Sequence, residues 1–187
     1  MGNRRVGRKR LYQLEKLGQA VDLGAGVGIK SAIKSATQHR NGQELITEIA
    51  IDLGVTGILG GGGDNGVIGK SGAASNITQL TVAKYGIITE IRAVLLEVPA
   101  GGCTILNVVT NSSTNTAQDA DLTSDERCAA MNVVGEDTSA AFDDHSSLGQ
   151  NGTAHTLYLT AGDGNNAQMT QGKILIYIHG FEVPADL

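Results

Sequence analysis

From Glu44 onward, apolar and polar residues alternate along the chain with a period of two. The clearest run is residues 44–53, where alternate positions separate an apolar side from a more polar one, as in a half-buried strand. Further apolar runs, bounded by Gly, Asn, Asp or Pro, predict strands at residues 76–83, 86–98, 103–110, 154–161 and 172–181. Six or more such strands predict a mainly β chain folded as a sandwich or a barrel.

Three stretches have helical spacing instead. Residues 4–19 and 29–39 each place apolar residues on one side of a helix and basic residues elsewhere. Residues 119–134 predict a third helix, with carboxylates near its start, where they suit the helix dipole. Isolated helices this short are marginal in water. We therefore expect the first two to be ordered mainly by packing against the rest of the chain or against a neighbouring subunit.

Charge divides the chain in two. Residues 1–40 contain nine Lys and Arg but two acids, a net charge of +7, whereas the remainder contains five basic and seventeen acidic residues, a net charge of −12. Parts of opposite charge attract different surfaces. The sequence thus predicts a basic N-terminal arm with short helices at residues 1–42 and an acidic body at residues 43–187, an organisation that suits docking better than catalysis.

Composition and length agree with a turn-rich β domain that carries an arm. The chain has 187 residues, with 26 Gly, two Pro and no Trp, which fits one domain plus an appendage. No run approaches the roughly 18 apolar residues of a membrane span, so we expect a soluble protein. The first residues contain neither a secretory signal core nor an N-myristoylation motif.

Two glycine-rich stretches imitate nucleotide-binding loops. Residues 63–71 end in the Gly-Lys-Ser of a phosphate-binding loop, but the first Gly of that motif is replaced by Asp64, whose charge would repel phosphate. Residues 24–29 resemble a dinucleotide-binding run until its last Gly is replaced by Ile29, and no predicted strand precedes it. Both stretches are interpreted as loops.

Other chemical candidates are weaker. Residues 143–147 gather Asp, His and Ser side chains, but neighbours in sequence cannot form a catalytic triad, so a solvated loop is expected. Residues 119–121 and 163–165 lack the continuation of a calcium loop and are interpreted as acidic turns. No metal-ligand spacing connects His39, His145, His155 and His179. We expect no metal, no cofactor and no enzymatic activity.

Cys103 and Cys128 are the two cysteines, and their spacing matches no zinc or redox motif. Two buried, reduced thiols are the simplest interpretation. A disulfide between them requires Cα atoms within about 7 Å, which the sequence leaves open.

Five basic residues near the N-terminus are the candidate docking residues: Arg4, Arg5, Arg8, Lys9 and Arg10. Such a run can neutralise phosphates and bind nucleic acid in a salt-sensitive way. It can also dock on an acidic protein surface or remain a solvated tail. The acidic body makes a dedicated nucleic-acid binder the weaker interpretation.

Three stretches carry a family resemblance. Residues 4–11 (Arg-Arg-Val-Gly-Arg-Lys-Arg-Leu), residues 83–92 (Ala-Lys-Tyr-Gly-Ile-Ile-Thr-Glu-Ile-Arg) and residues 169–181, which begin Met-Thr-Gln-Gly-Lys, resemble small virion structural proteins of tailed bacteriophages, especially marine ones. The resemblance is one of pattern and covers most of the chain. It implies an antiparallel, jelly-roll-like β-sandwich that assembles on the phage particle, and it transfers no catalytic residues.

The resulting hypothesis is a capsid decoration or cement protein, assembled in the host cytoplasm and located on the virion. Its expected partners are the major capsid protein or other virion proteins and further copies of itself, with no membrane partner. The alternative is a tail-associated adaptor, or a receptor- or sugar-binding fibre module, since jelly rolls also serve lectins. The aromatic residues are few and mostly lie within apolar patterns that suggest packing, which counts against a sugar-binding face.

Overall fold

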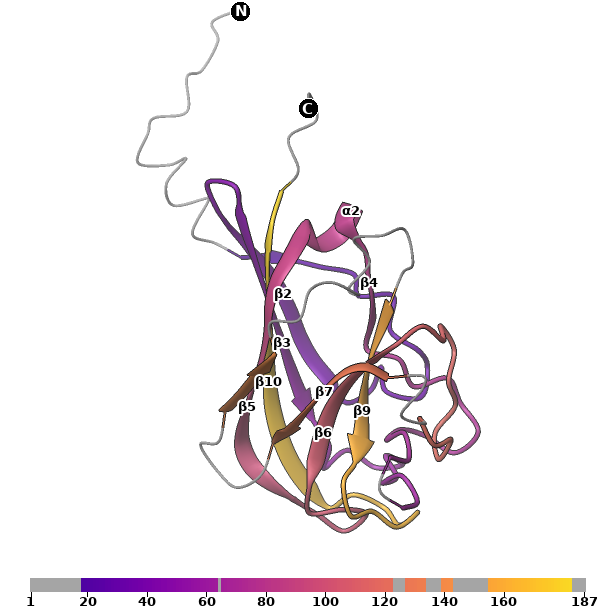
Figure 1. The fold of residues 1–187 in the computed structure, drawn as a ribbon. Coiled ribbons are helices and arrows are strands. Elements are labelled where there is room, and N and C mark those ends of the chain that lie inside the picture. The colour runs from indigo at the N-terminus through magenta and orange to yellow at the C-terminus, as the bar shows by residue number, and fades with distance from the viewer. Residues whose placement is uncertain (1–17, 64, 123–126, 134–138, 143–154, 183–187) are drawn as a thin grey trace, which may run out of the picture.

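The computed structural model describes residues 18–63, 65–122, 127–133, 139–142 and 155–182. These residues form two antiparallel sheets that face one another (Figure 1). The larger sheet has six strands in the order β1-β2-β3-β10-β5-β8, and the smaller has four in the order β4-β9-β6-β7. The prediction of a mainly β chain with antiparallel strands is confirmed.

The strands of the larger sheet are β1 (Gln19–Ala20), β2 (Ile33–Asn41), β3 (Glu44–Asp52), β5 (Ile87–Ala100), β8 (Ser139–Phe142) and β10 (Gln171–Phe181). Those of the smaller sheet are β4 (Thr78–Leu80), β6 (Leu106–Asn111), β7 (Arg127–Val133) and β9 (His155–Ala161). A single helical turn, α2 (Val82–Tyr85), joins β4 to β5. All six strands expected from the sequence are present, although β4 is short because α2 follows it closely.

One hydrophobic core lies between the sheets. Ile49 of β3 and Ile176 of β10 are cross-strand neighbours on the inward face of the larger sheet, and Leu159 of β9 belongs to the same cluster of buried residues. Burying one such side chain stabilises the fold by about 2 kcal/mol. Within the described ranges, none of the helices has the length or apolar content to cross a bilayer.

The prediction of a helix at residues 29–39 is wrong, because β2 occupies most of this stretch and pairs with β3. The register with β3 shifts just after Ile33, where Lys34 is an extra residue. This bulge lets Ile33 and Ala36 both pack against the core although they are three residues apart, which is the spacing of a helical face.

The expected N-terminal arm falls into two parts. Its residues 19–20 and 33–41 form β1 and β2 of the larger sheet. Residues 1–17, with most of the first expected helix, lie outside the described residues.

The helix expected at residues 119–134 is also wrong. Residues 127–133 form β7, which pairs with β6. Ahead of it, Asp119 has a φ of 70°, in the left-handed region that a right-handed helix does not use. Pairing with β6 supplies backbone hydrogen bonds to this stretch, and such tertiary context overrides a weak helical preference.

The segment after β1 crosses from the larger sheet to the smaller one. Val21 N donates to Ala36 O of β2 at 3.0 Å, and Thr78 Oγ1 of β4 donates to Leu23 O at 2.9 Å. The hydroxyl of Tyr85, a fully buried side chain, lies 2.7 Å from the same Thr78 oxygen. These bonds close one side of the space between the sheets.

Candidate protein-docking surface

The outward face of the smaller sheet is covered by the chain itself. Tyr158 of β9 and Val109 of β6 point outward, yet both are fully buried with Val67 and Leu122, which come from loops beside this sheet (Figure 1). The hydroxyl of Tyr158 donates to Ser113 O at 2.7 Å and so ties one of these loops down. This face is unavailable to a partner.

The outward face of the larger sheet has no comparable cover among the described residues. Along β10, buried inward positions alternate with exposed or half-buried outward positions from one end of the strand to the other. We call the outward side chains of the three middle strands the bare face. They are Glu44, Ile46, Glu48, Ala50 and Asp52 of β3; Ile87, Glu90, Arg92, Val94, Leu96 and Glu97 of β5; and Lys173, Leu175, Tyr177, His179 and Phe181 of β10.

At one end of the bare face the charges are paired. Lys173 Nζ lies 2.8 Å from Glu97 Oε2, and this hydrogen bond raises the pKa of Lys173 and lowers the pKa of Glu97. Asp52 Oδ2 lies 3.8 Å from Lys34 Nζ of β2. Pairs this exposed are screened by water and stabilise the sheet little, but they leave few free charges at this end.

At the other end the carboxylates lack cationic partners. Glu48 and Glu90 form no ion pair with a described Lys or Arg. Glu44 Oε1 lies 3.6 Å from His179 Nδ1, a pair that carries opposite charges only when the histidine is protonated. This end of the bare face is therefore acidic, and we call Glu44, Glu48 and Glu90 the acidic trio.

Tyr177 stands at the centre of the bare face. Glu48 on β3 and Arg92 on β5 flank it in register. Partial burial raises the pKa of Tyr177, and the charge of Glu48 raises it further against the opposite effect of Arg92. A half-buried ring with a polar tip and two charged neighbours is typical of a contact surface between proteins.

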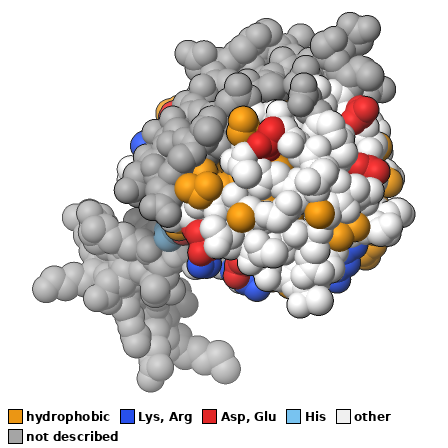
Figure 2. All heavy atoms as spheres, turned by 90° about the horizontal axis from the view of Figure 1, so that it is seen from below, with side chains coloured by type: hydrophobic (Ala, Val, Ile, Leu, Met, Phe, Trp, Pro, Cys, Tyr) orange, Lys and Arg blue, Asp and Glu red, His pale blue; other side chains and the backbone are white. Residues whose placement is uncertain are grey.

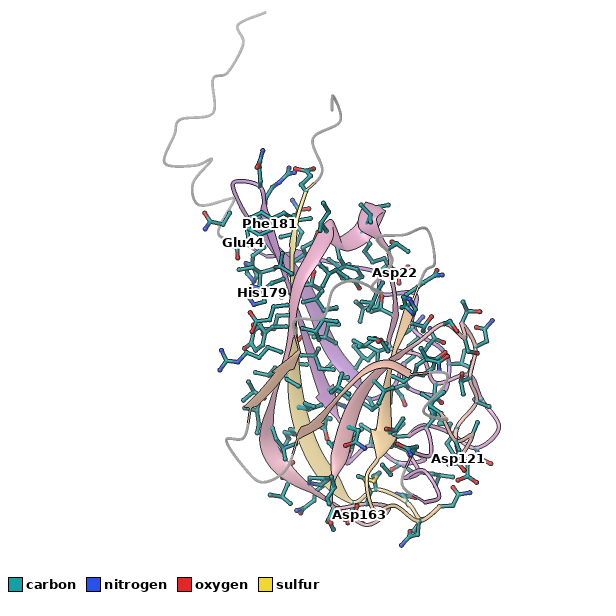
Figure 3. All side chains as sticks on the ribbon, in the orientation of Figure 1. Asp22, Glu44, Asp121, Asp163, His179 and Phe181 are labelled. Atoms are coloured by element: carbon teal, nitrogen blue, oxygen red, sulfur yellow. The ribbon has the colours of Figure 1, made fainter. Side chains whose placement is uncertain are left out.

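Apolar side chains lie at the acidic end as well. Phe181 and Ile87 are cross-strand neighbours with exposed fractions of 46% and 41%. Figure 3 shows Phe181 beside Glu44 and His179, on the side of the larger sheet that faces away from the smaller one. An exposed aromatic ring, an exposed aliphatic side chain and a carboxylate thus share one region of the surface.

The end of the molecule seen in Figure 2 is different. Hydrophobic side chains are scattered there among polar and backbone atoms, and charged groups lie mainly towards the margins. Single exposed hydrophobic residues are normal on protein surfaces, so the described residues at this end offer no comparable docking feature.

A hollow of about 290 Å³ lies between residues 20–25 and β2. Its lining consists of Ala20, Val21, Asp22, Leu23, Ala25, Lys30, Ile33, Lys34, Ser35 and Ala36. Asp22 Oδ1 accepts a hydrogen bond from Gly24 N at 3.0 Å, so its carboxylate serves a turn. The remaining lining is aliphatic apart from Ser35 and the two lysines, which suits an apolar contact and not a reaction.

The residues that imitate a phosphate-binding loop have a structural role. Leu59 and Gly69 exchange two backbone hydrogen bonds of 2.8 and 3.1 Å, and the residues after Ser71 form turns instead of the helix that a phosphate site needs. A Cβ on Gly69 would lie 2.0 Å from Ser75 Oγ. Close packing therefore accounts for this glycine, and the interpretation of residues 63–71 as a loop is confirmed for its described part.

The two acidic turns are confirmed, and their carboxylates hold loops together. Asp119 Oδ1 accepts from Gly62 N at 2.6 Å, and its Oδ2 accepts from Asn166 Nδ2 at 2.7 Å. Asp163 accepts hydrogen bonds from Thr104 N, Thr104 Oγ1 and Ile105 N. Burial acts to raise the pKa of Asp163, but these hydrogen bonds outweigh it and lower that pKa.

His39 and His179 flank Ile46 of β3 in the larger sheet, whereas His155 lies in the smaller sheet. His39 lies on β2 beside Gly18, His179 lies on the bare face, and His155 is buried on β9, where burial lowers its pKa. In the part of the chain that the structure describes, no three His, Cys, Asp or Glu side chains are grouped to hold a metal. His145 and the other residues of the expected loop at 143–147 lie outside the described residues.

Cys103 is a buried free thiol, as expected. Its Sγ lies 3.8 Å from Met169 Sδ. Burial raises the pKa of this thiol to about 12, and the negative charge of Asp163 adds to the effect. A protonated, buried thiol is unreactive. The side chain of Cys128 is not among those described.

The expected docking residues Arg4, Arg5, Arg8, Lys9 and Arg10 all lie outside the described residues, so their role stays a prediction. The structure adds the bare face, which the sequence analysis missed. The alternation along β3 and β10 indicated one outward side per strand, but nothing in this pattern indicated which sheet the loops would cover.

Comparisons with known proteins add no relative: no family model, no curated protein and no solved structure matches this chain.

Proposed function

We propose that this chain is a jelly-roll β-sandwich subunit of a phage virion, and specifically a capsid decoration or cement protein. The observation that carries the proposal is the strand order. When β3 to β10 are numbered as strands 1 to 8, the larger sheet contains the order 1-8-3-6 (β3-β10-β5-β8). The smaller sheet then has the order 2-7-4-5 (β4-β9-β6-β7). This order supports a jelly roll, an architecture used by viral capsid proteins and by lectins, with β1 and β2 added at one edge.

Two further features favour an assembly role. The bare face presents a middle strand, carboxylates and exposed rings without cover from the described residues. Residues 1–17 carry six basic residues and one acid. In the proposed function, residues 1–42 bind the capsid or adjacent copies, and Arg4, Arg5, Arg8, Lys9 and Arg10 make the contacts. Function still has to be argued from such sites, since the fold alone serves many functions.

The direct test is cryo-electron microscopy, at low and high salt, of the particle whose genome encodes this chain. Ordered copies on the capsid at low salt that are lost at high salt would support decoration through the basic residues. Density confined to the tail would favour the adaptor or fibre alternative. Particles without this chain would contradict both.

A variant separates the role of the basic residues from that of the fold. Replacing Arg4, Arg5, Arg8, Lys9 and Arg10 by Ser should abolish co-sedimentation with particles and leave the circular dichroism spectrum unchanged. A control variant with Lys70 replaced by Ser removes a cation that lies outside residues 1–42, and we expect it to bind normally. Full occupancy by the five-residue variant would contradict the proposed contacts.

The receptor- or sugar-binding alternative is favoured by one observation. Tyr177 and Phe181 are outward on the bare face, and the Phe181 side chain is 46% exposed, whereas the sequence analysis placed the aromatic residues inside packed patterns. Exposed rings are common on sugar-binding faces. Specific glycan binding on an array that is lost on Tyr177→Ala would place this alternative first.

We propose no catalytic activity. The residues that suggested chemistry have structural roles, as described for the carboxylates of Asp119 and Asp163 and for the close packing at Gly69. Binding of ATP that is lost on Lys70→Ala would overturn this part of the proposal.

A further inference from the structure

We propose that the bare face is the docking site for residues 1–17 of a second copy of this chain. This inference rests on the proposed function, in which copies assemble next to one another. It deepens that function because it names the surface that the N-terminal segment binds.

Charge complementarity is the first argument. Residues 1–17 carry a net charge of +5, and the acidic trio lacks Lys or Arg partners among the described residues. Arg side chains pair with carboxylates through two parallel hydrogen bonds, the strongest ion-pair geometry available to proteins. Four of the six cations in this segment are Arg. The segment can therefore supply the partners that Glu44, Glu48 and Glu90 lack.

The apolar groups also match. Val6, Leu11, Leu14 and Leu17 recur among the basic residues of the segment. On the bare face, Phe181 and Ile87 expose apolar surface, and Phe181 lies directly beside Glu44 of the acidic trio. A segment that mixes aliphatic and basic side chains can cover rings and carboxylates together, as interfaces with a hydrophobic centre and a charged rim do.

The direction of the chain at β1 selects a second copy over the same copy. Gln19 pairs with Gln38 and Ala20 with Thr37, so β1 starts at the end of the sheet near Asn41 and the β2–β3 hairpin, and a straight continuation of the preceding chain would lead away from that end. To lie on its own bare face, it would have to reverse direction at that end of the sheet. A neighbouring copy placed beyond the hairpin receives it without a reversal.

Cross-linking of the full chain tests the contact and its origin together. Equal amounts of unlabelled and ¹⁵N-labelled protein are mixed at low salt and treated with a carbodiimide, which joins the amines of Lys9 and Lys16 to carboxylates they touch. We expect cross-links to the acidic trio, about half of them between an unlabelled and a labelled peptide, and their loss at high salt. Cross-links within one isotope alone would show that the segment covers its own face and would overturn the proposal, as would their absence.

Charge variants give a second measurement that does not depend on the reagent. Replacing Glu44, Glu48 and Glu90 by Gln should weaken self-association in analytical ultracentrifugation roughly tenfold or more. The matched control replaces Asp22 and Asp121 by Asn and Glu182 by Gln, three acids outside the bare face, which changes the net charge equally, and we expect less than a roughly twofold change. If self-association is weakened equally in the two variants, the proposal is overturned. Particle binding of the wild-type chain is scored separately: if it persists without cross-links, this inference fails and the proposed function stands.

Discussion

At the scale of single residues, Asp119 is the clearest case of a side chain that the fold cannot replace. It has a φ of 70° and its carboxylate accepts bonds from Gly62 N and Asn166 Nδ2. We expect Asp119→Ala to lower the free energy of unfolding by about 2 kcal/mol, because it loses both bonds and strains the left-handed backbone. Asparagine tolerates this φ, so Asp119→Asn should lower the free energy of unfolding by about half as much. Urea denaturation measures both.

The control for this prediction is Asp121→Ala. Asp121 is exposed two residues away, and we expect its loss to change stability by less than about 0.5 kcal/mol. Equal costs at the two positions would show that general loop charge, and not the bonds of Asp119, stabilises this region.

Tyr85 predicts how stability depends on alkaline pH. Burial raises its pKa from 10 to about 12, against the opposing effect of its hydrogen bond with Thr78. The folded state therefore holds the phenol proton more tightly than the unfolded state. Its contribution is fully present below pH 10 and is lost as pH rises towards 12. The pKa of Cys103 is raised from 9 to about 12, so this thiol also contributes stability that is lost as pH rises above 9.

The test is Tyr85→Phe, followed by urea denaturation from pH 8 to pH 11.5. We expect a loss of about 1 kcal/mol at pH 8 from the missing hydrogen bond. Above pH 10, the stability of the variant should fall less steeply than that of the wild type, by up to about 1.4 kcal/mol per pH unit for one proton. Parallel curves would contradict burial of the phenol as the cause.

At the scale of elements, β2 shows how a bulge hides a strand. Lys34 is the extra residue opposite β3, and it brings Ile33 and Ala36 to the same face. Deleting Lys34 should leave a regular strand, so we expect the variant to fold with a loss below about 2 kcal/mol. Deleting Glu48, which pairs in register on both sides, shifts β3 by one residue and turns its inward set outward. We expect that variant to unfold, as circular dichroism would show.

The other elements show what sequence patterns can and cannot reveal. β10 was predictable because its inward positions alternate without interruption. β7 was missed because the pairing partner that orders residues 127–133, the edge of β6, is distant in the sequence. The positive φ of Asp119 could not be predicted either, since the bonds that accompany it join Asp119 to Gly62 and Asn166 in other loops.

At the scale of the whole molecule, the candidate site depends on relations that no local pattern contains. Charge asymmetry between the N-terminal residues and the rest was readable from counts alone. The sequence did not show which acidic residues lie near one another, because Glu44, Glu48 and Glu90 are brought together only by the register of three strands. Which face stays open depends in turn on where the loops around Val67 and Leu122 pack. The sequence thus predicted a docking protein but not the surface on which docking would occur.

The unequal covering of the two outward faces gives a last expectation that a matched pair of tyrosines can test. Tyr158 and Tyr177 both point outward, the first fully buried under loops and the second half-buried on the bare face. At a protein concentration where the chain is monomeric, Tyr158→Ala should cost about 3–5 kcal/mol of stability. Tyr177→Ala should cost less, about 2 kcal/mol, because water already reaches part of the surface that is lost. Similar costs in urea denaturation would mean that something covers the bare face in the monomer, which would remove it as an open docking surface.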